Sequence, residues 1–375
     1  MVTASAPRVL FVTRTWPPAV GGMEVYSREL AHALDQRSEL TVRSLPGRPD
    51  GSAPARWRIP GFLLRVIAHL LRHGRRQDVI VLGDLVLLPI AVMARLLAPR
   101  AKTVITVHGT DVFHDALPGW QSRFYGWYVK IWRRLGAQPS LVVANSAATA
   151  LHAERLGVTP VRVLHPGVHV PEAPEAASSP EAYILFVGRL IARKGAAWFA
   201  LEVLPRLPEY LRLRIAGTRS DPAESAVIDA CSRAEFLGAV HGEELVQLRR
   251  RALAVVVPNL DDRNRYFEGF GLVALEAAAD GAVVLAAAVD GIPDAVRDRE
   301  TGYLLPPGDA DAWANAIRGL LAQSHAERAA FIQRAREQVA QHYCWGRLAD
   351  QMLEACFSET GSREEEAERG TGRSH

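Results

Sequence analysis

The most informative stretch of the sequence runs from Glu268 to Glu276 and reads E-G-F-G-L-V-A-L-E. Its two glycines predict a tight turn, and the apolar residues that follow predict a helix. The N-terminus of such a helix offers backbone N–H groups to an anion, and a carboxylate on each side can hold the hydroxyls of a polyol. A nucleotide sugar carries both phosphate and hydroxyls. The plainer interpretation is a loop glutamate followed by a surface helix, because short motifs also occur by chance.

Short apolar runs alternate with helical patterns on the N-terminal side of this stretch and around it. The predicted strands are 8–13, 79–82, 103–107 and 141–144 in the first half, and 183–187, 211–216, 254–258 and 283–286 in the second. Helices are predicted at 23–34 and 147–156. Continuously apolar strands are typical of parallel sheets covered on both faces. The sequence therefore predicts an α/β protein with two Rossmann-like, doubly wound domains and a ligand site in the cleft between them.

The chain divides at a segment rich in proline, alanine and glutamate. This segment, 173–181, predicts a linker between a first domain, 1–172, and a second domain, 182–341. A chain of 375 residues is too long for one ordinary core, which agrees with two domains. The segment 358–375 is acidic and almost free of apolar residues, so we predict a disordered tail there.

Composition excludes several classes of protein. The net charge of +3, from 44 basic and 41 acidic residues, does not favour nucleic acid as a partner. Cys231, Cys344 and Cys356 lack C-x-x-C spacing, so neither a zinc site nor a disulfide framework is indicated, and a reduced, cytoplasmic compartment fits best. The most apolar stretch, 79–94, is interrupted by an aspartate and a proline and is shorter than the roughly 20 residues that a membrane span needs. No signal peptide is expected.

Glycines and charged residues follow several of the predicted strands. Gly21-Gly22 comes between the first strand and the first helix, which is an anion-binding layout or a plain turn. Arg189 and Lys194 follow the first strand of the second domain, where they could neutralise a diphosphate; the alternative is two solvated charges. His108 could hydrogen-bond a sugar hydroxyl or orient a reacting group, although a lone histidine is more often structural.

Other polar residues are given structural interpretations. Asp111 and the pair Asn145-Ser146 are assigned to helix capping, and Asp261-Asp262 to a solvated loop, so no metal site is predicted. The chain contains no G-x-G-x-x-G, G-x-x-x-x-G-K-[ST] or G-x-S-x-G motif, which counts against a dinucleotide cofactor, a P-loop ATPase and a serine hydrolase.

Two aromatic and basic stretches, 62–76 and 120–134, could contact an anionic membrane. The alternative is that both are ordinary helices that face the core of the first domain. Both stretches lie in the first predicted domain, which we assign to binding of the molecule that would accept a group from a nucleotide sugar.

Together these blocks resemble glycosyltransferase family 4, a family of retaining transferases with the GT-B fold. The residues from Glu268 to Glu276 are similar to its E-x7-E signature. The similarity covers nearly the whole chain, from about residue 8 to 357, and also includes the following blocks: Gly21-Gly22, His108-Gly109-Thr110-Asp111, Val187-Gly188-Arg189-Leu190 with Lys194-Gly195, Gly291-Ile292-Pro293-Asp294, and 301–308.

The resemblance implies a role for each matching residue. Arg189 and Lys194 would hold the donor diphosphate, Glu276 the ribose, and His108 would lie near the transferred sugar. The donor-binding set further comprises Gly21, Gly22, Gly188, and the backbone of Gly269, Phe270, Gly271 and Leu272, with Glu268 on the sugar hydroxyls. The catalytic set is His108, Arg189, Lys194 and Glu268. No cofactor or catalytic metal is implied, and the helix at 342–357 is expected to pack back on the first domain.

The predicted function is transfer of a hexose from a UDP- or GDP-linked sugar to a hydroxyl acceptor, such as a glycolipid, a lipid-linked intermediate or a polysaccharide intermediate. We expect a cytoplasmic protein that can contact the inner face of the cytoplasmic membrane. Two departures from the family pattern, Arg219 and the compressed segment 229–244, leave the identity of the nucleotide base open, and the segment 280–283 departs from the pattern as well. An epimerase or phosphorylase on the same fold and a non-catalytic nucleotide-sugar-binding protein remain alternatives.

Overall fold

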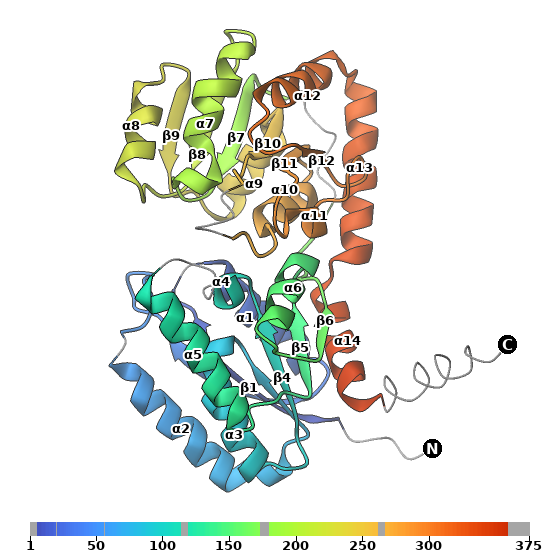
Figure 1. Ribbon diagram of the computed structural model, residues 1–375. Coiled ribbons are helices and arrows are strands. Elements are labelled where there is room, and N and C mark those ends of the chain that lie inside the picture. The colour runs from blue at the N-terminus through green and yellow to red at the C-terminus, as the bar shows by residue number, and fades with distance from the viewer. Residues whose placement is uncertain are drawn as a thin grey trace, which may run out of the picture.

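The computed structural model describes residues 6–19, 21–55, 57–113, 119–172, 180–261 and 267–358. These residues form two α/β units, the lower and the upper halves of Figure 1, each built on one six-stranded sheet. Most of the linker predicted at 173–181 and nearly all of the tail predicted at 358–375 lie outside the described residues. The domain limits given above therefore remain our proposal.

The first sheet is parallel throughout, with the strand order β2-β1-β3-β4-β5-β6. Its strands are β1 (Arg8–Trp16), β2 (Glu39–Pro46), β3 (Val79–Leu82), β4 (Lys102–Val107), β5 (Leu141–Ala144) and β6 (Val161–Val163). The helices of this unit are α1 (Gly22–Asp35), α2 (Arg58–His73), α3 (Leu88–Leu97), α4 (Thr110–Phe113), α5 (Trp120–Arg134) and α6 (Ala147–Arg155).

Alternate side chains of the central strands face opposite sides of the first sheet, as the period of two in a strand requires. Leu10 and Val12 of β1 point into a core that α2, α3, α5 and α6 cover. Val9 and Phe11 point into a second core, which is covered by α1 and by α14 (Trp345–Phe357) from the far end of the chain. Because both faces are buried, the strand sequences are apolar without interruption.

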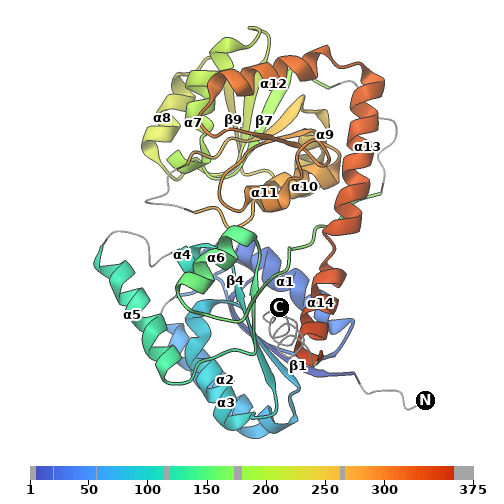
Figure 2. The same ribbon diagram turned by 45° about the vertical axis from the view of Figure 1, so that its right-hand side comes forward.

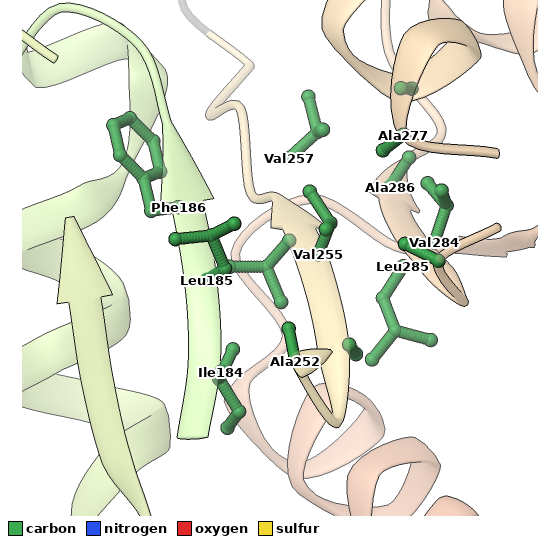
Figure 3. Packing of buried hydrophobic residues seen from close by; sticks show 14 of the residues in the cluster. Ile184, Leu185, Phe186, Ala252, Val255, Val257, Ala277, Val284, Leu285 and Ala286 are labelled. Atoms are coloured by element: carbon green, nitrogen blue, oxygen red, sulfur yellow. The ribbon is translucent and has the colours of Figure 1, made fainter. Parts of the chain in front are cut away.

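The second sheet is also parallel, with the order β12-β11-β10-β7-β8-β9. Its strands are β7 (Tyr183–Val187), β8 (Arg212–Ala216), β9 (Ala234–Gly238), β10 (Ala254–Val257), β11 (Val284–Ala287) and β12 (Tyr303–Leu305). The helices are α7 (Ala196–Trp198), α8 (Pro222–Ala230), α9 (Gly242–Arg251), α10 (Leu272–Asp280), α11 (Ile292–Ala295), α12 (Ala310–Ala322) and α13 (His325–His342). Figure 3 shows Leu185, Val255 and Leu285 from three neighbouring strands packed in its core.

The end of the chain crosses from the second unit to the first. Helix α13 runs along the second unit, and α14 continues beside the first sheet in both views (Figures 1 and 2). Trp345, Leu348 and Met352 of α14 are buried, and the ring of Trp345 meets Tyr26 of α1 edge-on with 5.4 Å between centroids. Among the described helices, none combines the length and apolarity needed to cross a bilayer.

Candidate functional site

A pocket of about 420 Å³ lies between the two sheets. Strands from both units end at it, because His108 follows β4, Asn145 follows β5 and Gly188 follows β7. This is where ligands bind in open parallel sheets. The first unit contributes Gly22, Met23, Tyr26, His108, Asn145 and Pro166 to its wall. The second contributes Phe186, Val187, Gly188, Arg189, Arg193, Lys194, Val257, Asn259, Phe267, Glu268, Gly269, Phe270, Gly271, Leu272 and Val273.

Glu268 is the centre of a charged cluster in this pocket. Its Oε2 accepts hydrogen bonds from the Lys194 ammonium, from Arg193 Nη1 at 3.2 Å and from Asn259 Nδ2 at 3.2 Å, and its backbone N donates to Asp290 Oδ2 at 2.9 Å. Burial by itself would raise the pKa of the Glu268 carboxyl. The charges of Lys194 and Arg193 outweigh that effect and lower the pKa to about 2. Glu268 is therefore ionised at every ordinary assay pH.

The lowered pKa has a consequence for stability that can be measured. Because the carboxyl has a lower pKa folded than unfolded, its ionisation stabilises the native state above about pH 4.5, and this contribution is lost as the pH falls toward 2. We expect the difference in unfolding free energy between wild type and Glu268→Gln to shrink between pH 6 and pH 3.5. Urea unfolding of both proteins at the two pH values measures it. A difference that stays constant would contradict the pairing.

The cations of the pocket are held by a short turn after β7. Arg193 and Lys194 lie on a 3₁₀ turn that ends at Gly195, which has φ 73°. A Cβ at Gly195 would come within 2.0 Å of the carbonyl oxygen of Pro258, so only glycine allows the turn to lie against the loop after β10. Arg189 is exposed at the mouth of the pocket. Lys194 and Arg189 were predicted from the sequence as diphosphate ligands, whereas Arg193 was not.

Two helices begin at the pocket and lack side-chain caps. Gly21 precedes α1 and Gly271, with φ 92°, precedes α10; neither helix start has a side-chain cap hydrogen bond. A Cβ at Gly22 would lie 3.7 Å from Leu272 Cδ1, so the two helix starts are close neighbours. Uncapped N–H groups and the positive ends of two helix dipoles favour an anion between them.

His108 is held by its neighbours in one tautomer. Its Nε2 lies 3.0 Å from the carbonyl oxygen of Gly83 and 3.2 Å from Thr106 Oγ1. Because a carbonyl only accepts, we assign the proton to Nε2, which leaves Nδ1 as the acceptor of the ring. The backbone N of His108 donates to Asp111 Oδ1 at 2.8 Å, and Tyr26 packs edge-on against the ring. Asp111, assigned to capping from the sequence, thus fixes the His108 loop.

The two units meet directly beside the pocket. Thr149 Oγ1 of α6 donates to the carbonyl oxygen of Gly269 at 3.3 Å. Asp294 of α11 accepts from the backbone N of Ala147 at 3.3 Å and lies 2.9 Å from His165 Nε2. These contacts join residues more than a hundred positions apart, so the pocket wall depends on the approach of the two units.

Glu276 and Gly21 are not part of the pocket wall. The carboxylate of Glu276 accepts from Arg249 Nη2 at 2.6 Å, and the buried Arg249 also donates to Asp280 at 2.7 Å. The side chain of Glu276 keeps a third of its surface exposed. The role of Arg249 was not predicted from the sequence, because its partner is 27 residues away on another helix.

No metal-binding group was found in the part of the chain that the structure describes, where no three His, Cys, Asp or Glu side chains gather around one point. Of the pair Asp261-Asp262, Asp261 is exposed, and Asp262 lies outside the described residues.

Comparisons with known proteins agree for both halves of the chain. A family model described as "Glycosyltransferase Family 4" matches residues 20–171, and one described as "Glycosyl transferases group 1" matches residues 181–323. A D-inositol 3-phosphate glycosyltransferase of Mycobacterium avium is 36% identical over 212 residues, which is 52% of this chain and 48% of that protein. Its counterpart in Mycobacterium tuberculosis (strain F11) is 32% identical over 237 residues, 58% of this chain and 48% of that one. The chain spans about half the length of these relatives.

Solved structures share the architecture. Anabaena Alr3699/HepE in complex with UDP superimposes with a TM-score of 0.70 at 19% identity, over 92% of this chain and 98% of that one. The sucrose-phosphate synthase of Thermosynechococcus elongatus gives 0.67 at 23% identity, over 93% and 98%. At these identities the likeness establishes the fold, with two facing parallel-sheet units of six strands each.

Proposed function

This chain belongs to glycosyltransferase family 4 and has the GT-B fold, and on that premise we propose that it transfers a hexosyl group from a nucleoside-diphosphate sugar to a hydroxyl with retention of configuration. One observation carries the proposal. Cations, two uncapped helix starts and the ionised Glu268 face the same pocket between the sheets. Cations and N–H groups suit a diphosphate, and a carboxylate suits sugar hydroxyls.

The proposed chemistry rests on stabilising the leaving group. The bond between the sugar C1 and the diphosphate oxygen breaks, and its electron pair leaves with the diphosphate. Arg189 and Lys194 neutralise that charge. The acceptor oxygen then bonds to C1 from the same face, and its proton passes to the departing phosphate oxygen. His108 orients the sugar through Nδ1, and Glu268 with the backbone of residues 269–272 holds the sugar hydroxyls. Contact between the two units excludes water, which would otherwise hydrolyse the donor.

A donor screen tests the proposal directly. UDP is bound in the structurally similar Anabaena protein, so UDP-sugars come first and GDP- and ADP-sugars follow. A donor present at ~100 times its dissociation constant is expected to stabilise the protein by about 2.7 kcal/mol, which a thermal-shift assay detects. The donor that binds is then incubated with glycolipid, lipid-linked and polysaccharide acceptors. If a donor binds but no acceptor receives the sugar and no epimer forms, the transferase assignment fails.

For the acceptor we propose a lipid-borne or polysaccharide molecule at the inner face of the cytoplasmic membrane. Helices α2 and α5 both pack on α3, on the same side of the first unit (Figure 1). Neither helix contains an acidic residue. Large apolar side chains are exposed along them: Trp57 just before α2, Leu64 and Leu71 on α2, and Trp120, Phe124 and Trp127 on α5. We call these residues, together with the exposed arginine and lysine side chains of α2 and α5, the α2–α5 surface.

Helix α5 has one side that faces the core of the first unit and one side that faces solvent, so each of the two interpretations of its sequence fits one side. Tyr125, Tyr128 and Trp132 pack against the core of the first unit. Trp120, Phe124 and Trp127, at helical spacing, form an outward stripe with Arg123 and Lys130 beside it. An aromatic stripe next to basic side chains suits an interface with anionic lipid, which supports the membrane proposal.

Vesicle binding tests the α2–α5 surface. We expect the double variant Arg123→Glu/Lys130→Glu to bind anionic vesicles at low salt about tenfold or more weakly than wild type, since each base near such a surface contributes about 1 kcal/mol. Arg334→Glu, an exposed change on α13, serves as the control and should bind like wild type. Equal binding by the α5 variant and wild type, or none by wild type, would remove the membrane part of the proposal.

A further inference from the structure

Two asparagines line the pocket, one from each unit. Asn145 follows β5 of the first sheet, and Asn259 follows β10 of the second. Their exposed fractions are only 7% and 3%. In each, the side-chain oxygen Oδ1 is buried and has no hydrogen-bond partner among the described residues. A buried carbonyl oxygen without a partner is rare in folded proteins and calls for an explanation.

The orientation of Asn259 follows from its neighbour. Its Nδ2 donates to Glu268 Oε2 at 3.2 Å. An ionised carboxylate only accepts, so the amide nitrogen must face Glu268 and the oxygen must point elsewhere. The same Glu268 oxygen is held by Lys194 and Arg193. Asn259 Oδ1 is therefore a fixed acceptor beside the carboxylate that we assign to the sugar hydroxyls.

Asn145 lies across from the same segment. A Cβ at Gly269 would come within 3.1 Å of Asn145 Nδ2, so the amide stands against the backbone that follows Glu268. The sequence assigned Asn145-Ser146 to capping, but Ser146 alone does this work, since its Oγ accepts from Thr149 N at 3.1 Å. Asn145 therefore lines the pocket with a buried carboxamide oxygen that no described residue satisfies.

We propose that Asn145 and Asn259 bind hydroxyls of the transferred sugar, and that they contribute to sugar specificity; the proposal rests on the proposed function. A carboxamide oxygen accepts from a hydroxyl, whereas phosphate oxygens need donors and are served by Lys194 and Arg189. Because Asn145 belongs to the first unit and Asn259 to the second, the sugar meets both amides only when the units are in contact. Recognition of the sugar is then coupled to closure of the pocket.

The test compares the affinity for a nucleoside diphosphate with that for the same nucleotide carrying the sugar. By calorimetry, Asn145→Ala and Asn259→Ala should bind UDP like wild type and bind the UDP-sugar about three- to tenfold more weakly, the size expected for one neutral hydrogen bond. Asn315→Ala, a surface asparagine on α12, is the control and should change neither affinity. If GDP is the preferred nucleotide, GDP and its sugar replace the UDP pair.

A series of deoxy sugars sharpens the test. At the hydroxyl that an asparagine binds, the deoxy donor should lose affinity for wild type but lose nothing further in the alanine variant. An unchanged ratio of the two affinities in both variants would overturn the inference while leaving the proposed function intact, because UDP binding would still be present. Absence of binding by wild type to any nucleotide or its sugar would overturn both.

Discussion

Replacing Lys194 by alanine is expected to slow glycosyl transfer by about 10²–10³-fold, the loss seen when one donor to a developing negative charge is removed. Lys194 contacts Glu268 inside the pocket, at the end of the sheet where the diphosphate is proposed to bind. Arg193 and Asn259 still contact the carboxylate in the variant, so the fold should survive. Initial rates at saturating donor, with circular dichroism as the check on folding, measure the effect.

Lys102→Ala is the matched control for this experiment. Lys102 is exposed and begins β4, at the end of the strand opposite to His108 and the pocket. Its removal should leave the rate unchanged.

Glu268→Ala should also abolish most transfer, because the variant loses the ionised group assigned to the sugar hydroxyls. Near-normal turnover by either the Lys194 or the Glu268 variant would contradict the roles assigned to this cluster.

Gly269→Ala is expected to reduce the rate of transfer by about 10²-fold or more, because it disturbs the contact between the two units. A Cβ at Gly269 would lie 2.1 Å from the carbonyl oxygen of His108, so one methyl group would push the first unit away from the second. A displacement of about 1 Å at a reacting centre can cost 10²-fold in rate. Both cations assigned to the diphosphate, Arg189 and Lys194, come from the second unit, and only the start of α1 comes from the first, so UDP affinity should fall by less than the transfer rate. Rates and calorimetry on the same variant separate the two effects.

Gly319→Ala provides the control for the added methyl group. Gly319 lies in α12, where a Cβ would meet no heavy atom within 4 Å, and alanine is the better helix former. This variant should keep full activity and be slightly more stable. If Gly269→Ala transfers sugar at the wild-type rate, the contact between the units is not required for turnover.

The sequence predicted the centre of each sheet and missed its edges. The strands found from apolar runs correspond to β1, β3, β4, β5, β7, β8, β10 and β11, while β2, β6, β9 and β12 escaped notice. These four are the edge strands of the two sheets. Edge strands are only partly covered, as the mixed exposure of β9 illustrates, so they lack the continuous apolar run that identifies a strand buried on both faces.

The candidate site was predictable where a motif residue follows a strand, and not where a partner comes from elsewhere. His108 and Lys194 follow strand ends, Glu268 precedes a glycine turn, and the structure brings the three to one pocket. Arg193 lies between Arg189 and Lys194 in the chain but belongs to none of the motif blocks, so it was not predicted. Asn259 belongs to no motif. Pairings such as Lys194 with Glu268 depend on how two loops 74 residues apart approach each other, which local sequence does not specify.

A crystal structure of the protein with its nucleotide-sugar donor would show whether the pocket between the two sheets binds the donor. We expect the diphosphate within hydrogen-bond distance of Arg189 or Lys194 and at the start of α10, with the sugar between His108 and Glu268. A donor bound away from these residues, or a diphosphate that contacts neither cation, would contradict it.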